Sequence, residues 1–271
     1  MTTILKIGGS EVTDKRKAVE PKGDLHSTVE AYFRRADVER YARELMEGLD
    51  GGRDIILIHG AGASAHYELE VAYPTHKSPQ RVIEAASYTS KLFCETLEDC
   101  GLKVRRHEPA ELVTNMEKGI EWAKLMREFD NDIADGVIPV AHGTLVRSGV
   151  GGPYDGYVVL SGDVVPIQAA VHKKQRTLFF TSDQRGIYDR NPSEPGAVLL
   201  RRITPSEDVG KYSIRGREAD VSGGPLGKAR LLQAAVREHG ITSHIFSAME
   251  HGNIREVLQG NLEVVGTTIC Q

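Results

Sequence analysis

The segment that most constrains the fold is residues 55–66, where an apolar run ends in a cluster of small residues. Residues 55–58 (Ile-Ile-Leu-Ile) have the continuous apolar character of a strand buried on both faces. Gly60, Ala61 and Gly62 follow almost at once, between His59 and His66. Backbone made of Gly and Ala can approach an anion closely and direct its N–H groups towards it. The segment therefore predicts a buried strand that leads into an anion-binding turn.

Strand-like apolar runs alternate with helical patterns along the whole chain. The expected strands are residues 3–7, 54–58, 102–106, 137–141, 177–181, 243–246 and 264–269. The expected helices are residues 25–49, 80–100, 118–129, 164–171, 226–238 and 254–258. Strands separated by helices of this length pack as a mostly parallel sheet that helices cover on both faces. We therefore expect an α/β fold, a three-layer αβα sandwich, with a soft boundary near Thr177.

Composition excludes several classes of protein. The chain has 271 residues, enough for one large α/β domain or two unequal lobes. Its formal net charge of -4 argues against a general nucleic-acid or anionic-membrane binder. Cys94, Cys100 and Cys270 are odd in number and lack metal or redox spacing. No secretion signal or membrane-length apolar run is apparent, so we expect a cytoplasmic protein.

Two known nucleotide-binding patterns fit the sequence poorly. Residues 223–229 are similar to a P-loop, but the spacing is one residue short and no Ser or Thr follows Lys228. Gly60-x-Gly62-x-x-Ala65 matches the permissive dinucleotide fingerprint. That fingerprint needs an acidic residue at the end of the next strand, whereas Glu84 lies in a helical pattern. Neither a Walker-type NTPase nor a dinucleotide enzyme is favoured.

Four turns of small residues are expected at the carboxyl ends of strands. They are Gly8-Gly9-Ser10, His59-Gly60-Ala61-Gly62, Ser161-Gly162-Asp163 and Asp220-Val221-Ser222-Gly223-Gly224. In an open parallel sheet, that edge is where ligands bind. Together with Lys6, Lys15 and Lys228, the turns predict a cradle for several phosphates, as phosphoryl transfer requires.

In these motifs the chain resembles the amino acid kinase superfamily and, within it, the isopentenyl phosphate kinases. The motifs are Ile4-Leu5-Lys6-Ile7-Gly8-Gly9-Ser10 with Thr13-Asp14-Lys15, His59-Gly60-Ala61-Gly62 with His66, Ser161-Gly162-Asp163, Gly186-Ile187-Tyr188 with Arg190-Asn191-Pro192, residues 220–224 with Gly227-Lys228, and Gly252-Asn253-Ile254 with Gly266-Thr267. The resemblance implies one amino acid kinase-like domain over residues 1–271. It divides this domain into an acceptor-binding lobe (about 1–176) and a nucleotide-binding lobe (about 177–271).

The resemblance also implies an activity, the transfer of a phosphoryl group from ATP, with Mg²⁺, to a small phosphate monoester such as isopentenyl phosphate. Lys6 and Lys228 would stabilise the group in transit, and Lys15 would close over the donor. Asp163 would hold the lysines by charge-assisted hydrogen bonds and stay ionised among them. His66 would donate a hydrogen bond to the acceptor phosphate. That acceptor needs no general base, because its oxygen is already ionised near neutral pH.

The remaining implied residues bind the two substrates. The ATP-binding set is Lys6, Gly8, Gly9, Ser10, Lys15, Asp183, Tyr188, Gly223, Gly224 and Lys228. The acceptor-binding set is Gly60, Ala61, Gly62, His66 and Gly162. The resemblance assigns no protein metal ligand, and a homodimer is the expected assembly.

Two positions depart from the family pattern. Thr144 follows Gly143 where the family usually has an aspartate, and Arg185 stands where a second aspartate is common. Residues 148–156 are rich in glycine and poor in apolar side chains. His142 and Arg147 make this region more polar than a pocket for an isoprenoid tail would be. A small polar phosphate or phosphonate, such as fosfomycin, is therefore an alternative acceptor.

Other interpretations stay open at this point. A non-catalytic module that senses a nucleotide or a phosphate is one, although the presence of Lys6, Asp163 and Lys228 argues against it. A carboxylate kinase of the same superfamily, such as acetylglutamate or carbamate kinase, is another, but it is not expected to use a phosphate-binding His66. Asp163 also suits a simple helix N-cap, and His59 suits a structural role.

Overall fold

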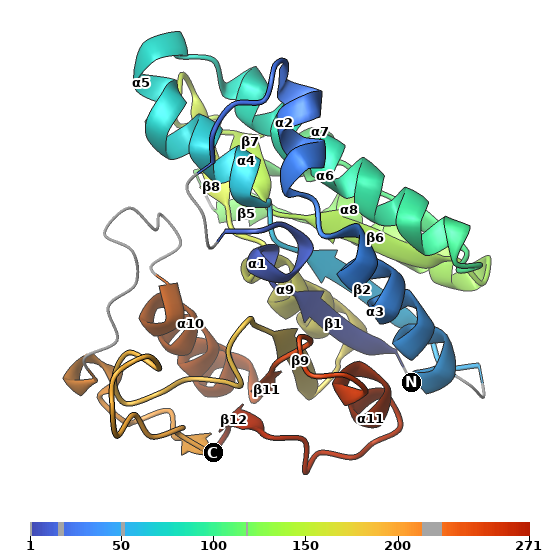
Figure 1. Ribbon diagram of the computed structural model, residues 1–271, viewed down its shortest axis with the longest axis vertical. Helices are drawn as coiled ribbons and strands as arrows, with labels where there is room; N and C mark the ends of the chain where they lie inside the picture. Colours follow the sequence, from blue (N-terminus) through green and yellow to red (C-terminus); the bar gives the residue numbers. More distant parts are fainter. Residues whose placement is uncertain (1, 16–18, 50–51, 118, 213–223) are drawn as a thin grey trace.

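The computed structural model describes residues 2–15, 19–49, 52–117, 119–212 and 224–271 (Figure 1). An eight-stranded sheet lies at its centre, in the order β10-β12-β11-β9-β1-β2-β6-β3. The strands are β1 (Thr3–Ile7), β2 (Ile55–His59), β3 (Val104–Arg106), β6 (Ile138–His142), β9 (Thr177–Thr181), β10 (Arg202–Ile203), β11 (Thr242–Phe246) and β12 (Gly266–Ile269). All neighbouring pairs are parallel except β11 with β12. The predicted mostly parallel sheet is confirmed.

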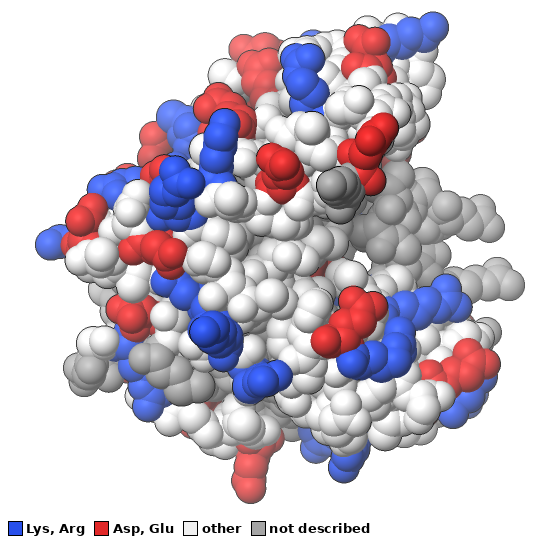
Figure 2. All heavy atoms as spheres, turned by 180° about the vertical axis from the view of Figure 1, so that it is seen from behind, with Lys and Arg blue, Asp and Glu red and all other residues white. Residues whose placement is uncertain are grey.

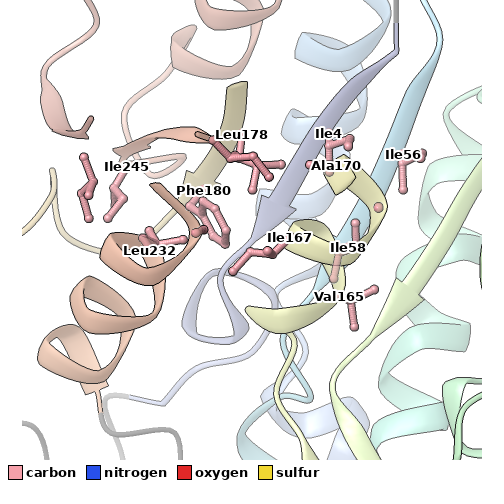
Figure 3. Close-up of a cluster of buried hydrophobic side chains, with 14 of the residues drawn as sticks. Ile4, Ile56, Ile58, Val165, Ile167, Ala170, Leu178, Phe180, Leu232 and Ile245 are labelled. Atoms are coloured by element: carbon pink, nitrogen blue, oxygen red, sulfur yellow. The ribbon is translucent and has the colours of Figure 1, made fainter. Parts of the chain in front are cut away.

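Helices cover both faces of this sheet. The longer ones are α2 (Leu25–Tyr32), α3 (Arg35–Gly48), α6 (Pro79–Asp99), α8 (Ala123–Ala134), α9 (Val164–Lys173), α10 (Gly224–His239) and α11 (Asn253–Leu258). Successive side chains of a strand point to opposite faces. Ile4 of β1 therefore packs with residues of α8, α9 and α10, whereas Leu5 packs with residues of α3, α6 and α11. The αβα sandwich is confirmed, and Figure 3 shows the first of these two cores, where Ile4, Val165 and Leu232 lie in one cluster.

The sheet runs unbroken across the boundary expected near Thr177. β9 begins at Thr177 and pairs with β1, so the strands on either side of that boundary share one central sheet. No helix of the described ranges is long and apolar enough to cross a membrane. On the face seen in Figure 2, basic and acidic side chains are interspersed.

The single helix predicted over residues 25–49 is wrong, because the chain forms α2 and α3 with a break at Phe33. The N–H group of Asp14 donates to the Tyr32 carbonyl over 2.8 Å, and that of Arg34 donates to the Val12 carbonyl over 2.9 Å. Phe33 itself has extended backbone (φ -70°, ψ 133°). Pairing with the segment after β1 therefore replaces the helical hydrogen bonds at this point.

Several short elements were not predicted. β7 (Thr144–Arg147) pairs with β8 (Tyr157–Leu160), and β4 (Thr114–Met116) pairs with β5 (Gly119–Glu121), both as antiparallel hairpins outside the central sheet. β5 occupies the start of the helix predicted over residues 118–129. The remaining short elements are α1 (Gly9–Val12), α4 (Ala63–Tyr67), the π-helix η1 (Glu68–Ala72), α5 (Tyr73–His76), α7 (Pro109–Leu112) and the 3₁₀-helix η2 (Val209–Lys211).

Candidate active site

Glycine turns from four segments meet at the carboxyl edge of the central sheet. A Cβ atom on Gly60 would lie 2.6 Å from the backbone of Gly9, so the turns after β1 and β2 touch backbone to backbone. A Cβ on Gly143 would lie 2.8 Å from the nitrogen of Gly162, which brings the turns after β6 and β8 together. Gly162 also lies against Gly60. Any larger side chain would separate these turns. The turn at Gly162 follows the carboxyl end of a strand, as expected, but that strand is β8, which lies outside the central sheet.

A lysine–aspartate–lysine cluster lies beside these glycines. The Nζ atom of Lys6 lies 2.8 Å from Oδ1 of Asp163, and the Nζ atom of Lys228 of α10 lies 3.8 Å from the same oxygen. All three side chains are largely buried. Asp163 precedes α9 but makes no capping hydrogen bond with its side chain, so the N-cap interpretation does not describe it.

The electrostatics of this cluster favour an ionised Asp163. Burial opposes ionisation, but the charges of Lys228 and Lys6 outweigh it and lower the pKa of Asp163 to about 2. Burial lowers the pKa of Lys228, and the Asp163 carboxylate opposes that change. The expectation that Asp163 stays ionised agrees with this arrangement.

Two pockets open from the cluster. Lys6, Gly9, Lys15 and Asp163 line both of them. The first pocket, called here the nucleotide pocket, has Gly8, Ser10, Asp183, Tyr188, Gly224 and Lys228 in its wall. Every described member of the predicted ATP-binding set is therefore in one place, and Gly223 lies outside the described residues.

The second pocket, called here the acceptor pocket, has a polar end and an apolar end. Gly60, Ala61, His66 and Gly162 lie in its wall, as the sequence predicts. Gly62 does not line it, because this residue (φ +91°) turns the chain into α4 between Thr13 and Thr89. The apolar end is formed by side chains from η1, α6, β7 and β8, namely Leu69, Val82, Leu145, Val159 and Leu160.

His66 is held by an acidic neighbour on the next helical turn. Its Nδ1 lies 3.1 Å from Oε1 of Glu70, and the His66 side chain keeps about a quarter of its surface exposed. When Nδ1 donates to Glu70, the ring can offer a second donor at Nε2 only as the imidazolium cation.

The residues that make the acceptor pocket look polar in the sequence do not line it. His142 is buried and lies 3.2 Å from Glu108, and Arg147 stacks on the Tyr157 ring at the surface. Thr144 does lie in the wall, so the carboxylate expected there by family pattern is a hydroxyl. Arg185 pairs with Glu250 and lies outside the described wall of the nucleotide pocket.

Sequence reasoning missed three kinds of site residue. The apolar end of the acceptor pocket has no sequence signal, because its side chains come from four separate elements. Glu70 had a signal, the spacing of four residues from His66 on a helix. The last kind is a buried carboxylate under the first glycine turn, Glu11, which lies in α1, a short helix that the sequence did not predict.

Two pockets that meet at a cluster of lysines and an aspartate form the arrangement that a phosphotransferase requires. The model of the amino acid kinase family matches residues 1–247. The chain therefore belongs to the amino acid kinase family.

Curated relatives match most of the chain, and one of them matches nearly all of it. The chain is 28% identical to an isopentenyl phosphate kinase of Methanothermobacter thermautotrophicus, with 98% of each protein covered. It is 25% identical to an isopentenyl phosphate kinase of Arabidopsis thaliana, with 76% of this chain and 71% of the relative covered. A crystal structure of an isopentenyl phosphate kinase superimposes with a TM-score of 0.71 at 25% identity, covering 99% of this chain and 100% of that one.

Proposed function

We propose that this chain transfers the γ-phosphoryl group of ATP to isopentenyl phosphate. The observation that carries the proposal is the shared wall of the two pockets, where Lys6, Gly9, Lys15 and Asp163 face both. A phosphoryl group can then pass between donor and acceptor without leaving the cluster of lysines. Direct transfer needs such an in-line arrangement of the two substrates.

The acceptor pocket supports a phosphate with a short apolar tail. His66 and the glycine turns provide donors for the phosphate at one end, and Leu69, Leu145 and Val159 surround the tail at the other. A polar acceptor such as fosfomycin would leave that apolar wall without a matching group. The curated relatives named isopentenyl phosphate kinase support the same choice.

Each charged residue has a separate role in the proposed reaction. Lys6 and Lys228 stabilise the negative charge on the transferred group, and Asp163 holds both ammonium groups in the cluster. Lys15 lies in the wall of both pockets and binds the donor phosphates. His66 binds the acceptor phosphate, whose own ionised oxygen is the nucleophile, so no side chain has to remove a proton.

Mg²⁺ is proposed to enter with the nucleotide. The described residues contain no group of three or more His, Cys, Asp or Glu side chains that could hold a metal ion. Mg²⁺ characteristically keeps several waters and binds substrate phosphates, so the site residues fit an ion held mainly by ATP. When bound, the ion supplies further neutralisation of phosphate charge. The division into acceptor and nucleotide lobes is part of the proposal, and the homodimer and cytoplasmic location stay predictions.

A panel of acceptors tests the proposal. Release of ADP is measured with isopentenyl phosphate, dimethylallyl phosphate, methyl phosphate, fosfomycin and glutamate. Isopentenyl phosphate has four more carbons than methyl phosphate, which are worth about 3 kcal/mol when buried, or about 10²-fold in kcat/KM. Equal rates with methyl phosphate would contradict the tail pocket. A preference for fosfomycin or glutamate would identify a different acceptor, and ATP binding without turnover would indicate a sensor.

A further inference from the structure

Glu11 is a fully buried carboxylate beneath the first glycine turn of the nucleotide pocket. Its Oε2 accepts a hydrogen bond from the N–H group of Gly8 over 2.9 Å and another from the Thr181 hydroxyl. Its Oε1 accepts a hydrogen bond from the N–H group of Ala248 over 2.9 Å. Three donors from three separate segments therefore converge on one side chain.

These three segments extend from neighbouring strands of the central sheet. Gly8 follows β1, Thr181 ends β9 and Ala248 follows β11, and the sheet order places these strands side by side. Gly8 and Thr181 are themselves part of the wall of the nucleotide pocket, with Ile245 of β11. Glu11 therefore joins the parts of the sheet edge from which that pocket is built.

The turn at Gly8 lies directly against this carboxylate. A Cβ atom on Gly8 would lie 2.8 Å from Oε2 of Glu11 and 3.1 Å from the Thr181 carbonyl oxygen. Because the N–H group of Gly8 points inward to Glu11, the direction of the next peptide groups is set as well. Those belong to Gly9 and Ser10, which line the pocket.

Charged and titratable groups face Glu11 from the surrounding elements. Lys6 of β1 and Lys228 of α10 attract its negative charge. Tyr41 of α3 donates its hydroxyl to the Glu11 carbonyl oxygen over 3.3 Å, and Arg40 donates to the Ala248 carbonyl oxygen over 2.7 Å. Burial raises the pKa of Glu11 to about 7, although the hydrogen bonds from Thr181, Ala248 and Gly8 and the charge of Lys6 oppose this.

We propose that ionised Glu11 is a positioning residue of the nucleotide site, which holds the turn of Gly8 and Gly9 in the conformation that binds the donor phosphates. This inference rests on the proposed function. The ionised carboxylate accepts all three hydrogen bonds, whereas a proton on either oxygen replaces one acceptor by a donor. The hydroxyl of Thr181 can reverse its role, but Gly8 and Ala248 have only N–H groups to offer at this point.

The test is the binding of ATP, measured by titration calorimetry at pH 8.5 and at pH 6. Glu11→Gln keeps the size of the side chain and one acceptor oxygen, but it replaces the other oxygen with an NH₂ group, which cannot accept a hydrogen bond from the surrounding N–H groups. We expect its Kd for ATP to be about tenfold above that of the wild type at pH 8.5. The ratio should fall towards one at pH 6, because Glu11 in the wild type is then itself mostly protonated. Protonation of the ATP phosphates changes the Kd of the variant and of the wild type alike, so it cancels in their ratio.

Asp132→Asn is the matched control. Asp132 of α8 is also fully buried and lies 2.5 Å from Nε2 of His107, but it does not line the nucleotide pocket and has no contact with the partners of Glu11. Its substitution should leave the Kd for ATP unchanged at both pH values. A merely structural role for buried carboxylates would make the two variants behave alike.

The possible failures are distinguishable. Equal or tighter ATP binding by Glu11→Gln at pH 8.5, where the wild-type carboxylate is ionised, overturns the role of Glu11. If that variant does not fold, Thr181→Val decides: it removes one donor to the carboxylate while keeping the branched side chain, and wild-type affinity at pH 8.5 would overturn the inference. A wild-type protein that does not bind ATP at all would instead refute the proposed function.

Discussion

Replacing Asp163 by Asn tests the cluster of lysines most sharply, because one carboxylate oxygen holds both ammonium groups. Its pKa falls from 3.8 to about 2 in the fold. Each pKa unit is worth about 1.4 kcal/mol, so the ionised form gains about 2.5 kcal/mol of stability. For a chain of this length, the loss should lower Tm by about 5–10 °C at pH 7.

The pH dependence of this loss has a definite sign. The pKa of Asp163 is lower in the folded than in the unfolded chain. Its contribution to the free energy of unfolding is therefore fully present above about pH 3.8 and disappears as the pH falls towards 2. The difference in Tm between wild type and Asp163→Asn should therefore be constant from pH 5 to 7 and shrink below pH 4. Thermal unfolding followed by calorimetry measures it.

ATP provides a second readout for the same variant. Nucleotide phosphates bring negative charge to Lys6 and Lys228, so saturating ATP should narrow the Tm difference. Asp130→Asn is the control, because Asp130 pairs with Lys173 at the surface, where such pairs contribute about 1 kcal/mol or less. A difference in Tm for Asp163→Asn no larger than that of the control would refute the reasoning.

Three further substitutions probe the separate parts of the site. Lys228→Ala should lower kcat by about 10²-fold or more, the size of losing one charge-stabilising donor, whereas Lys211→Ala removes an exposed ammonium group and should leave steady-state rates unchanged. His66→Ala should raise KM for the acceptor while KM for ATP stays within about twofold, and full activity would indicate a carboxylate kinase instead. Gly60→Ala would bring a methyl group to 2.6 Å from the first glycine turn, so we expect reduced ATP binding together with a Tm several degrees lower. Wild-type binding and stability in this last variant would show that the turns do not touch.

Much of the fold could be predicted because its signals are local. The apolar runs at residues 55–58 and 177–181 are short and continuous and have polar residues on either side, which is the pattern of buried parallel strands. The break at Phe33 had no such signal, since it results from pairing with the segment after β1. The hairpin of β7 and β8 was missed because a glycine-rich connection hid two short strands.

The residues of the candidate site also fall into a group that the sequence predicts and a group that it does not. Lys6 and the glycine turns are recognisable because phosphate binding requires those residue types next to one another in the sequence. The apolar end of the acceptor pocket depends on which elements the tertiary fold brings together, as Leu69 and Val159 illustrate. Glu11 is hidden for a similar reason: only packing against β9 and β11 buries a carboxylate that would otherwise face water.

The most direct test of the central claim is phosphorus NMR of the protein incubated with ATP, Mg²⁺ and isopentenyl phosphate. The account predicts that the γ-phosphate signal of ATP and the monoester signal decline together, while the two coupled signals of a diphosphate ester and those of ADP appear in equal amounts. Release of inorganic phosphate in place of the diphosphate ester, or no change in the spectrum, would contradict direct transfer between the two pockets.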